Sequence, residues 1–516
     1  MSFSVNAPRL VGAWLAAPAV ATPNRPALEC DNVVLTYGEL DVQSTELALA
    51  LLSSGIERGT RIATLSENRP EQVALFFACA KAGLVFAPLN WHLSTQELVA
   101  QLSIITPALL VVSRARWSIV EDLAATVPVA RRALHLETLP TELPAPLVGV
   151  ELPAVLETDG LLLIGTSGTT GSPKCALLTH ANCYWTNRGL DLSVPLHESD
   201  VVLQVLPQYH VGGWNVQPLL AWSKGAAVIL ETSFRAERVL TLVATRGVTT
   251  MMGVPTTYLA IAQQPEFVTA DLSSLRCVVV GGAPMTSAVV ERWIDRGVSV
   301  VQGYGLTEAS PNVMCLAAVD ALDHAGSVGQ PYSYVDVALY DDDSKTLVEG
   351  VGRGEICVRG PNVFAGYWND PYATAQVLRD GWLMTGDVAE RDGDGYYRIS
   401  GRTKEMYISG GENVFPTEVE RVLTTHHDVI DAAVVAVPHP HWGQSGVAFV
   451  VARSGSTIDV AQLRQFCRQR LAGYKVPGHF YVVAQLPLTS VGKPDKSVLG
   501  ALANAPASAA RPAPTS

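Results

Sequence analysis

The chain has 516 residues and 48% apolar content, enough for more than one core, so at least two domains are expected. Its 36 basic and 48 acidic residues give a formal net charge of −12, and this field repels nucleic acids and anionic membranes, which sets DNA and RNA aside as partners. No run of the chain reaches the ~18 apolar residues that a membrane span requires.

The segment over residues 9–21 predicts an amphipathic helix, because Leu10, Trp14 and Leu15 fall on one helical face. A signal peptide is disfavoured, since one arginine supplies the only charge and prolines interrupt or flank the apolar part. The eight cysteines of the chain are scattered, without a close pair of the kind that binds zinc or forms a redox dithiol. They predict reduced thiols and a cytoplasmic location.

Apolar runs typical of buried strands then alternate with helical patterns. The runs are RIATLSEN, ALLVVS, AAVIL, RCVVVGG and VSVVQGYG. This alternation predicts α/β layers with largely parallel sheets. After about Tyr332, short strands and turns, including EICVRG and YYRIS, predict a smaller β subdomain.

The last part of the chain predicts a compact α+β unit, with a helix near Thr417, the strands AAVVAV and GVAFVV, a helix over residues 460–472 and the strand HFYVVAQL. The predicted fold class is therefore α/β. A large N-terminal domain of layered α/β subdomains plus a small β subdomain covers residues 1–402, and a small α+β C-terminal domain covers residues 403–500. The Ala-, Pro- and Ser-rich residues 501–516 predict a disordered tail.

Residues 161–180, LLLIGTSGTTGSPKCALLTH, join an apolar run to hydroxyls, three glycines and a lysine. Glycines let the backbone approach a ligand, hydroxyls and amides donate hydrogen bonds, and Lys174 adds positive charge, a combination that suits polyphosphate oxygens. The stretch is not a usual P-loop, because Ser172 and Pro173 separate Gly171 from Lys174. A flexible surface turn is the alternative interpretation.

Two later strands also end in glycines, since RCVVV runs into GGAPM and VSVVQ runs into GYGLTE. Tyr304 offers a face on which a base can stack, and Glu308 offers a carboxylate for Mg²⁺. A packed aromatic and a solvated acid are the alternatives for these two residues.

Six stretches occur in the order and approximate spacing of the acyl-adenylate-forming (AMP-binding) superfamily. They are TSGTTGSPK, LPQYHVGG, GYGLTE, GWLMTGD, GRTKEMYISGGENVFPTEVE and PLTSVGKPDK. The chain resembles this superfamily of acyl-CoA synthetases, peptide-synthetase adenylation domains and firefly luciferase from about Pro23 to Leu499. LPQYHVGG and ISGGENVFPTEVE look most like the fatty acyl-CoA synthetase (ligase) family.

The resemblance implies two reactions at one site. A carboxylate first joins ATP to give acyl-AMP and pyrophosphate; the small, mobile C-terminal domain then swings, and a thiol, usually of CoA, displaces AMP. The residues that would hold the β and γ phosphates are Thr166, Ser167, Gly168, Thr169, Thr170 and Lys174. The residues that would hold adenine are Gly282, Ala283, Pro284, Gly303 and Tyr304. Thr307 would touch the α-phosphate, and Glu308 and Thr166 would coordinate Mg²⁺.

The resemblance assigns five further residues. Asp387 matches a carboxylate that accepts both ribose hydroxyls, and Arg402 matches a second ribose or phosphate contact. Lys493 matches a lysine that bridges the substrate carboxylate and the α-phosphate, and Lys404 lies at the hinge. His210 matches a histidine that orients or gates the substrate carboxylate, which is already ionised at pH 7 and needs no general base. The alternative interpretations of Asp387, Lys493 and His210 are a turn residue, a solvated surface charge and a hydrogen-bonded core histidine.

Three residues depart from the superfamily pattern. Cys175 replaces a glycine after the lysine and is expected to tighten or slow phosphate binding, Tyr209 replaces a phenylalanine, and Gly401 replaces an aspartate. Val211, Gly212, Gly213 and Trp214 are expected to begin an apolar wall of the acyl pocket, with little bulk before the tryptophan. No aspartate stands just after His210, where amino-acid-activating relatives carry one, which disfavours a free amino acid as substrate.

The predicted function is an ATP-dependent carboxylic acid:CoA ligase for a medium- or long-chain fatty acid, working through acyl-AMP with ATP, Mg²⁺ and CoA. The nearest alternative is a fatty acyl-AMP ligase that passes the acyl group to the phosphopantetheine of an acyl carrier protein. The lack of an extra insertion between Gly386 and Lys404 favours CoA. A catalytically idle nucleotide-binding protein and a light-emitting enzyme are further alternatives, and a homodimer stays open.

Overall fold

A computed structural model describes residues 9–166, 173–283, 285–342, 344–440, 442–489 and 492–505 of the chain. The chain forms two compact units, the larger comprising Met1–Val337 with Val358–Met384, and the smaller Ala338–Cys357 with Thr385–Ser516. The predicted α/β class, with a large N-terminal domain and a smaller C-terminal domain, is confirmed. The predicted boundary between residues 402 and 403 differs from the bounds of these two units. That residues 403–500 move as a separate domain stays a prediction.

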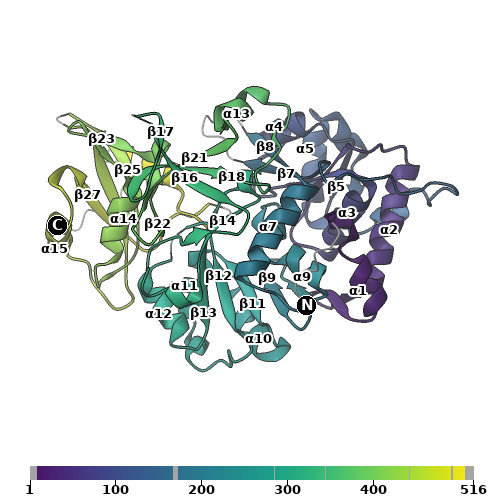
Figure 1. The fold of residues 1–516 in the computed structure, drawn as a ribbon, viewed down its shortest axis with the longest axis horizontal. Helices are drawn as coiled ribbons and strands as arrows, with labels where there is room; N and C mark the ends of the chain where they lie inside the picture. Colours follow the sequence, from purple (N-terminus) through teal and green to yellow (C-terminus); the bar gives the residue numbers. More distant parts are fainter. Residues whose placement is uncertain are drawn as a thin grey trace. The chain divides into compact units, whose positions relative to one another are not determined.

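A nine-stranded sheet in the larger unit contains several of the strands expected from apolar runs (Figure 1). Its order is β15-β14-β13-β12-β11-β9-β10-β1-β2. The strands are β1 (Pro26–Cys30), β2 (Val33–Thr36), β9 (Val201–Gln204), β10 (Ala227–Leu230), β11 (Thr250–Gly253), β12 (Cys277–Val280), β13 (Ser299–Gly305), β14 (Asn312–Leu316) and β15 (Gln330–Pro331). Neighbours from β10 through β9, β11 and β12 to β13 are parallel, so their carboxyl ends meet at one edge.

A second sheet of the larger unit has seven strands in the order β19-β8-β7-β4-β3-β5-β6. The strands are β3 (Arg61–Leu65), β4 (Val85–Leu89), β5 (Leu109–Val112), β6 (Leu134–His135), β7 (Gly160–Thr166), β8 (Lys174–Thr179) and β19 (Gly366–Tyr367). β7 and β8 are antiparallel, with Thr166 opposite Lys174, so the glycine-rich stretch connects the two strands of a hairpin.

The helices of the larger unit are α1 (Ala16–Ala21), α2 (Tyr37–Ser53), α3 (Pro70–Ala82), α4 (Thr95–Ile105), α5 (Val120–Ala124), α6 (Leu139–Glu142), α7 (His180–Ser193), α8 (Gly212–Asn215), α9 (Pro218–Lys224), α10 (Ala236–Arg246), α11 (Pro255–Ala262), α12 (Ser287–Ile294) and α13 (Pro371–Val377). Reciprocal hydrogen bonds between Thr36 and Glu39 fix the start of α2. The single helix expected over residues 9–21 is instead a 3₁₀ turn followed by α1, because Pro18 has no N–H to donate to the Trp14 carbonyl. None of the described helices combines the length and apolar character needed to cross a bilayer.

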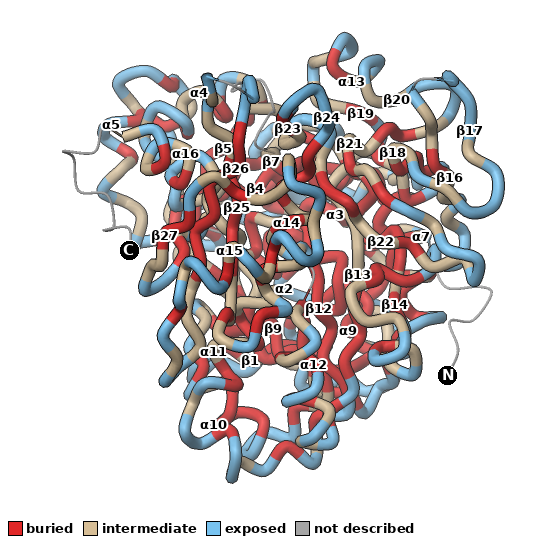
Figure 2. The backbone as a smooth tube through the Cα atoms, turned by 90° about the vertical axis from the view of Figure 1, so that its left-hand side faces the viewer, coloured by how far each residue is buried: buried red, intermediate tan, exposed pale blue. Residues whose placement is uncertain are grey.

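The core of the nine-stranded sheet lies where β9, β11, β12 and β13 pack against α10, α11 and α12. Met251, Val278, Val300 and Trp293 are among its buried side chains. Figure 2 shows buried stretches along the strands and exposed stretches along the loops and outer helix faces. Because these strands are buried on both faces, their sequences are continuously apolar, which is why the sequence predicts them well.

A six-stranded sheet follows, in the order β17-β16-β18-β21-β20, with β22 paired to β21. Its strands are β16 (Asp336–Asp341), β17 (Thr346–Val348), β18 (Gly352–Arg359), β20 (Leu378–Arg379), β21 (Trp382–Arg391) and β22 (Tyr397–Arg402). These short strands correspond to the predicted β subdomain, and the chain passes between the two units within them.

The remainder of the smaller unit is an α+β fold with a five-stranded sheet, in which β25 and β26 are antiparallel. Its elements are β23 (Tyr407–Ser409), β24 (Glu412–Val414), α14 (Pro416–Thr424), β25 (Val429–His439), β26 (Gly443–Ala452), α15 (Val460–Arg468), β27 (His479–Val483) and α16 (Lys496–Asn504). Residues 501–504, expected in a disordered tail, belong to α16, because Leu499 and Ala503 are buried against the sheet. Residues 506–516 lie outside the described part.

Candidate active site

The carboxyl edge of the nine-stranded sheet gathers several predicted site residues. Gly282 and Ala283 follow β12, and Gly303 and Tyr304 lie in the adjoining strand β13. Gln302, which the sequence does not single out, ties the two segments together, because its Nε2 donates to the Ala283 carbonyl oxygen at 3.2 Å. Its Oε1 accepts the Met285 amide at 3.1 Å.

Gly282 is one position where the backbone itself requires glycine. Its φ is +83°, a left-handed conformation that costs a glycine little and other residues more. The strand therefore turns sharply at its carboxyl end and leaves Ala283 beside the next strand. Pro284, the remaining member of the predicted adenine set, lies outside the described residues.

A second group of predicted residues meets around Tyr367. The Tyr367 hydroxyl donates to Glu308 Oε1 at 2.7 Å, and Lys174 Nζ lies 5.0 Å from the centre of the Tyr367 ring. The backbone adds a further link, since the Phe364 amide donates to the Glu308 carbonyl oxygen at 2.9 Å. Burial, followed by the Glu308 carboxylate, raises the pKa of Tyr367, so its hydroxyl stays a donor.

The structure therefore brings Lys174 and Glu308 together through a tyrosine that the sequence analysis missed. No local pattern reveals Tyr367, because it reaches Lys174 only through the pairing of β19 with β8. Thr307 and Glu308 belong to a short 3₁₀ turn directly after β13. Thr166 donates to the Lys174 carbonyl oxygen at 3.4 Å across the hairpin. The other predicted phosphate-binding residues, Ser167, Gly168, Thr169 and Thr170, lie outside the described part of the chain.

Cys175 lies in the core and not beside the ligand, so its expected effect on phosphate binding stays a prediction. Its side chain is fully buried in the core of the seven-stranded sheet with Leu163 and Ala87. Successive strand residues face opposite sides, so Cys175 points away from the side on which Lys174 lies. Burial raises the pKa of the Cys175 thiol to about 12, which makes it unreactive as well.

His210 lies in a turn that determines which of its nitrogens carries the proton. The Gly212 amide donates to His210 Nδ1 at 3.2 Å. The neutral ring therefore carries its proton on Nε2 and presents that nitrogen as a donor. Gly213 is required in the same turn, because a Cβ there would lie 2.4 Å from the Pro207 carbonyl oxygen.

Two aromatic residues near His210, Trp214 and Tyr209, pack against other rings. Trp214 is fully buried, stacks on Phe76 with ring centres 4.4 Å apart, and donates to the Gln208 carbonyl oxygen at 2.6 Å. Its expected place in a pocket wall is wrong, because its ring and its N–H are both committed to the core. Tyr209 packs edge-on against Trp91 and His92, at ring distances of 6.4 and 6.2 Å.

Three predicted residues form one cluster in the smaller unit. Arg402 Nε donates to Asp387 Oδ1 at 2.7 Å, and the two residues are opposite each other in the β21–β22 pair. The pKa of Lys493 is lowered, first by burial and then by the charge of Arg402, while Asp387 and Glu405 act in the opposite direction. The Thr489 amide donates to the Lys493 carbonyl oxygen at 2.7 Å, which closes the loop that presents the lysine.

Lys404 is exposed in a 3₁₀ turn immediately after this cluster, and its role as the hinge stays a prediction. Next to it, Glu405 is bound at 2.9 Å by Lys496, which also lies 3.0 Å from Glu420. Lys496 thus connects Glu405, which follows Lys404, to the segment that carries Lys493.

The packing around Gly401 explains why this residue departs from the superfamily pattern. A Cβ at this position would lie 2.7 Å from Phe415 Cδ1, and φ is +152°. An aspartate there would displace the Phe415 ring, so packing accounts for the glycine.

Glycine-terminated parallel strands, a lysine hairpin and a carboxylate–arginine–lysine cluster on a separate small unit define a nucleotide-dependent, two-unit α/β enzyme. Comparison identifies the family: residues 15–368 match the AMP-binding enzyme model, and residues 418–493 match the model of the AMP-binding enzyme C-terminal domain. The chain belongs to this family, as predicted.

The chain is similar over nearly its whole length to several named relatives. It is 41% identical to a feruloyl-CoA synthase of Amycolatopsis sp, over 94% of this chain and 97% of the relative. It is 36% identical to an indoleacetate–CoA ligase of Aromatoleum aromaticum, over 93% and 95%.

Two solved structures extend the comparison. An o-succinylbenzoate-CoA synthetase of Bacillus subtilis, in complex with ATP and magnesium, is 29% identical with a TM-score of 0.84, over 94% of this chain and 99% of that one. A fatty acyl-CoA synthetase of Mycobacterium tuberculosis is 30% identical with a TM-score of 0.77, over 95% and 97%.

Proposed function

We propose that the chain is an ATP-dependent ligase that joins an aromatic carboxylic acid to CoA through an acyl-adenylate. In the first step a carboxylate oxygen attacks the α-phosphorus, the bond to the β-phosphate breaks and pyrophosphate leaves. In the second step the CoA thiol attacks the acyl carbon, the bond to AMP breaks, and AMP leaves while the thiol proton passes to solvent. The enzyme class, an acid–thiol ligase forming AMP, agrees with the names of the relatives.

The larger unit supplies the nucleotide contacts. Lys174 and Thr166 hold the phosphates together with Ser167, Gly168, Thr169 and Thr170, which lie between them in the sequence. Glu308 is an anionic oxygen ligand fixed by the Tyr367 hydroxyl, which suits Mg²⁺. When bound, Mg²⁺ offsets phosphate charge. The adenine lies between the glycine ends of β12 and β13, against Tyr304.

The smaller unit supplies the ribose and the reacting-centre contacts. Asp387, buried and fixed by Arg402, accepts the ribose hydroxyls. Lys493 reaches the α-phosphate and the substrate carboxylate, where charge accumulates in the transition state. His210 donates its Nε2–H to the carboxylate from the larger unit and positions it without removing a proton.

The likeness to the feruloyl-CoA synthase is the observation that favours an aromatic acid, because it covers nearly the full length of both chains. Indoleacetate and o-succinylbenzoate, named for two other relatives, are aromatic acids too. The medium- or long-chain fatty acid expected from the sequence is the second candidate, favoured by the fatty acyl-CoA synthetase structure.

Pyrophosphate release tests the proposal directly. The purified chain is incubated with ATP, Mg²⁺ and a panel of cinnamic acids, arylacetic acids, fatty acids and amino acids, with and without CoA, and acyl products are identified by mass. The proposal expects rapid turnover with aryl acids and accumulation of aryl-CoA. Preference for fatty acids supports the second candidate. Acyl-AMP that accumulates while CoA goes unused supports an acyl carrier protein as the acceptor, and no release with any acid contradicts the ligase proposal.

A further inference from the structure

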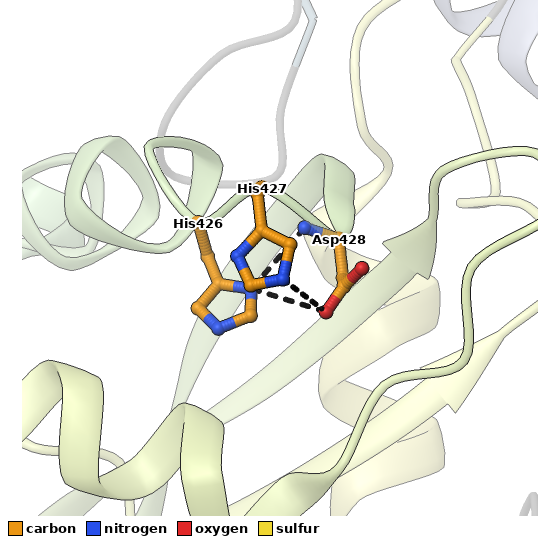
Figure 3. A group of neighbouring side chains, drawn as sticks. All are labelled: His426, His427 and Asp428. Carbon is orange, nitrogen blue, oxygen red and sulfur yellow. Dashed lines mark hydrogen bonds and ion pairs between the residues drawn. The ribbon is translucent and has the colours of Figure 1, made fainter.

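The turn between α14 and β25 in the smaller unit gathers three metal-type ligands that catalysis does not use. His426, His427 and Asp428 each place a ligand atom within 4.8 Å of the others (Figure 3). Asp428 Oδ2 lies 3.0 Å from His427 Nε2 and 3.9 Å from His426 Nδ1. Figure 3 shows both rings turned to the same side as the carboxylate.

The backbone of this turn is fixed by its neighbours. The Val429 amide donates to the His426 carbonyl oxygen at 3.0 Å, and the Arg453 amide donates to the Asp428 carbonyl oxygen at 2.7 Å. Arg453 Nε donates to the His427 carbonyl oxygen at 3.0 Å. The His426 ring packs edge-on against Phe466 at 4.9 Å. The three ligands are therefore held near one another before any ion binds, which lowers the ordering cost of binding.

We propose that this turn binds a divalent transition-metal ion of the Zn²⁺ type. Two imidazole nitrogens and one carboxylate oxygen form a ligand set that zinc and its neighbours accept and that Mg²⁺ does not prefer. With metal–ligand bonds of about 2.0–2.2 Å, tetrahedral ligand atoms lie roughly 3.3 Å apart. The observed separations of 3.0 and 3.9 Å from Asp428 bracket this value. The two imidazole rings stack with their centres 4.5 Å apart, so the exposed His427 ring must turn to point its nitrogen at the same ion.

Other groups at the site set its strength. His426 Nδ1 accepts the Asp428 amide at 3.3 Å, a long hydrogen bond that the ion would replace. Arg453 and Arg470, the latter 3.6 Å above the Phe466 ring, add positive charge nearby. His427 is 80% exposed, so water completes the coordination. With three protein ligands, one of them exposed, the site is an exchangeable one, and its ion joins the end of α14 to the start of β25.

Zinc binding to the full-length, nucleotide-free protein tests this proposal. The matched variants are His427→Asn, which removes the exposed ligand, and His479→Asn, which removes an exposed histidine elsewhere in the same unit. Isothermal titration with ZnCl₂ in the presence of excess Mg²⁺ should show one site in the wild type and in His479→Asn. His427→Asn should weaken this site at least tenfold.

Two readouts separate the site from adventitious binding. Co²⁺ should give a d–d absorption spectrum with nitrogen ligands in the wild type, and this spectrum should be lost in His427→Asn. Zn²⁺ should raise the thermal midpoint of the wild type and of His479→Asn only. The proposal is overturned if the wild type binds no Zn²⁺, or if His427→Asn binds it as tightly as the wild type. Since His427 is exposed, an unchanged circular dichroism spectrum for its variant excludes misfolding as the cause.

Discussion

Replacing Tyr367 with phenylalanine removes one oxygen that fixes Glu308, while the ring beside Lys174 stays. The lost hydrogen bond is 2.7 Å long and has a charged acceptor, a type that contributes about 1.5–3 kcal/mol. If this energy is fully expressed in the adenylation transition state, pyrophosphate release slows by about 10- to 100-fold. The Mg²⁺ concentration for half-maximal rate should rise as well, because Glu308 loses its orientation.

The assay measures pyrophosphate release against Mg²⁺ concentration, and separately measures thioester formation from preformed acyl-AMP. Tyr372→Phe is the control, since Tyr372 is a nearby tyrosine that is 77% exposed. Tyr367→Phe should impair the first reaction and spare the second. A normal rate with an unchanged Mg²⁺ requirement, or an equal loss in both reactions, would refute the orienting role of the hydroxyl.

Three further predictions concern other described side chains. Lys493→Ala should slow adenylation by ~10²-fold or more and spare the thioester step. Because burial lowers the pKa of Lys493, the rate of wild-type adenylation should begin to decline with rising pH below the ordinary lysine pKa of ~10.4. A rate that stays constant up to that pH would contradict this role of Lys493. Cys175→Ala should keep the rate of pyrophosphate release but lower the free energy of unfolding by about 1 kcal/mol, measured in urea; a large rate change would place the thiol in the site after all. Lys496→Met leaves Glu405 and Glu420 without their shared cation and should lower the free energy of unfolding by about 1–3 kcal/mol. Because the folded pKa of Lys496 is raised, this stabilisation is complete below the unfolded value of ~10.4 and is lost as pH rises through the folded pKa; a difference that already vanishes near pH 8 would argue against it.

The sequence predicted the parts of the molecule whose signals are local. The strands around Val278 and Val300 are continuously apolar because they are covered on both faces, so their positions follow from composition alone. Asp387, Arg402 and Lys493 were assigned by resemblance, and the structure places them in one cluster. Their roles in catalysis stay predictions.

The missed residues depend on contacts between distant parts of the chain. Tyr367 acquires its importance from the pairing of β19 with β8, and Gln302 from a loop that follows another strand. The position of Trp214 was predicted wrongly, because the sequence near His210 does not distinguish a tryptophan ring that faces a ligand from one that packs on Phe76. The predicted tail begins too early for a similar reason. Leu499 and Ala503 hold the end of α16 in place only because they are buried against a sheet formed by other parts of the chain.

The alternation along β8 has a consequence for how variation in this enzyme family is interpreted. Lys174 and Cys175 are consecutive, yet Lys174 is predicted to contact the phosphates, whereas Cys175 fills the volume available between Leu163 and Ala87. An evolving chain can therefore exchange the second residue together with its packing neighbours and keep its chemistry. A motif comparison that gives every residue of this stretch equal weight will therefore mistake a substitution at a buried position for loss of activity.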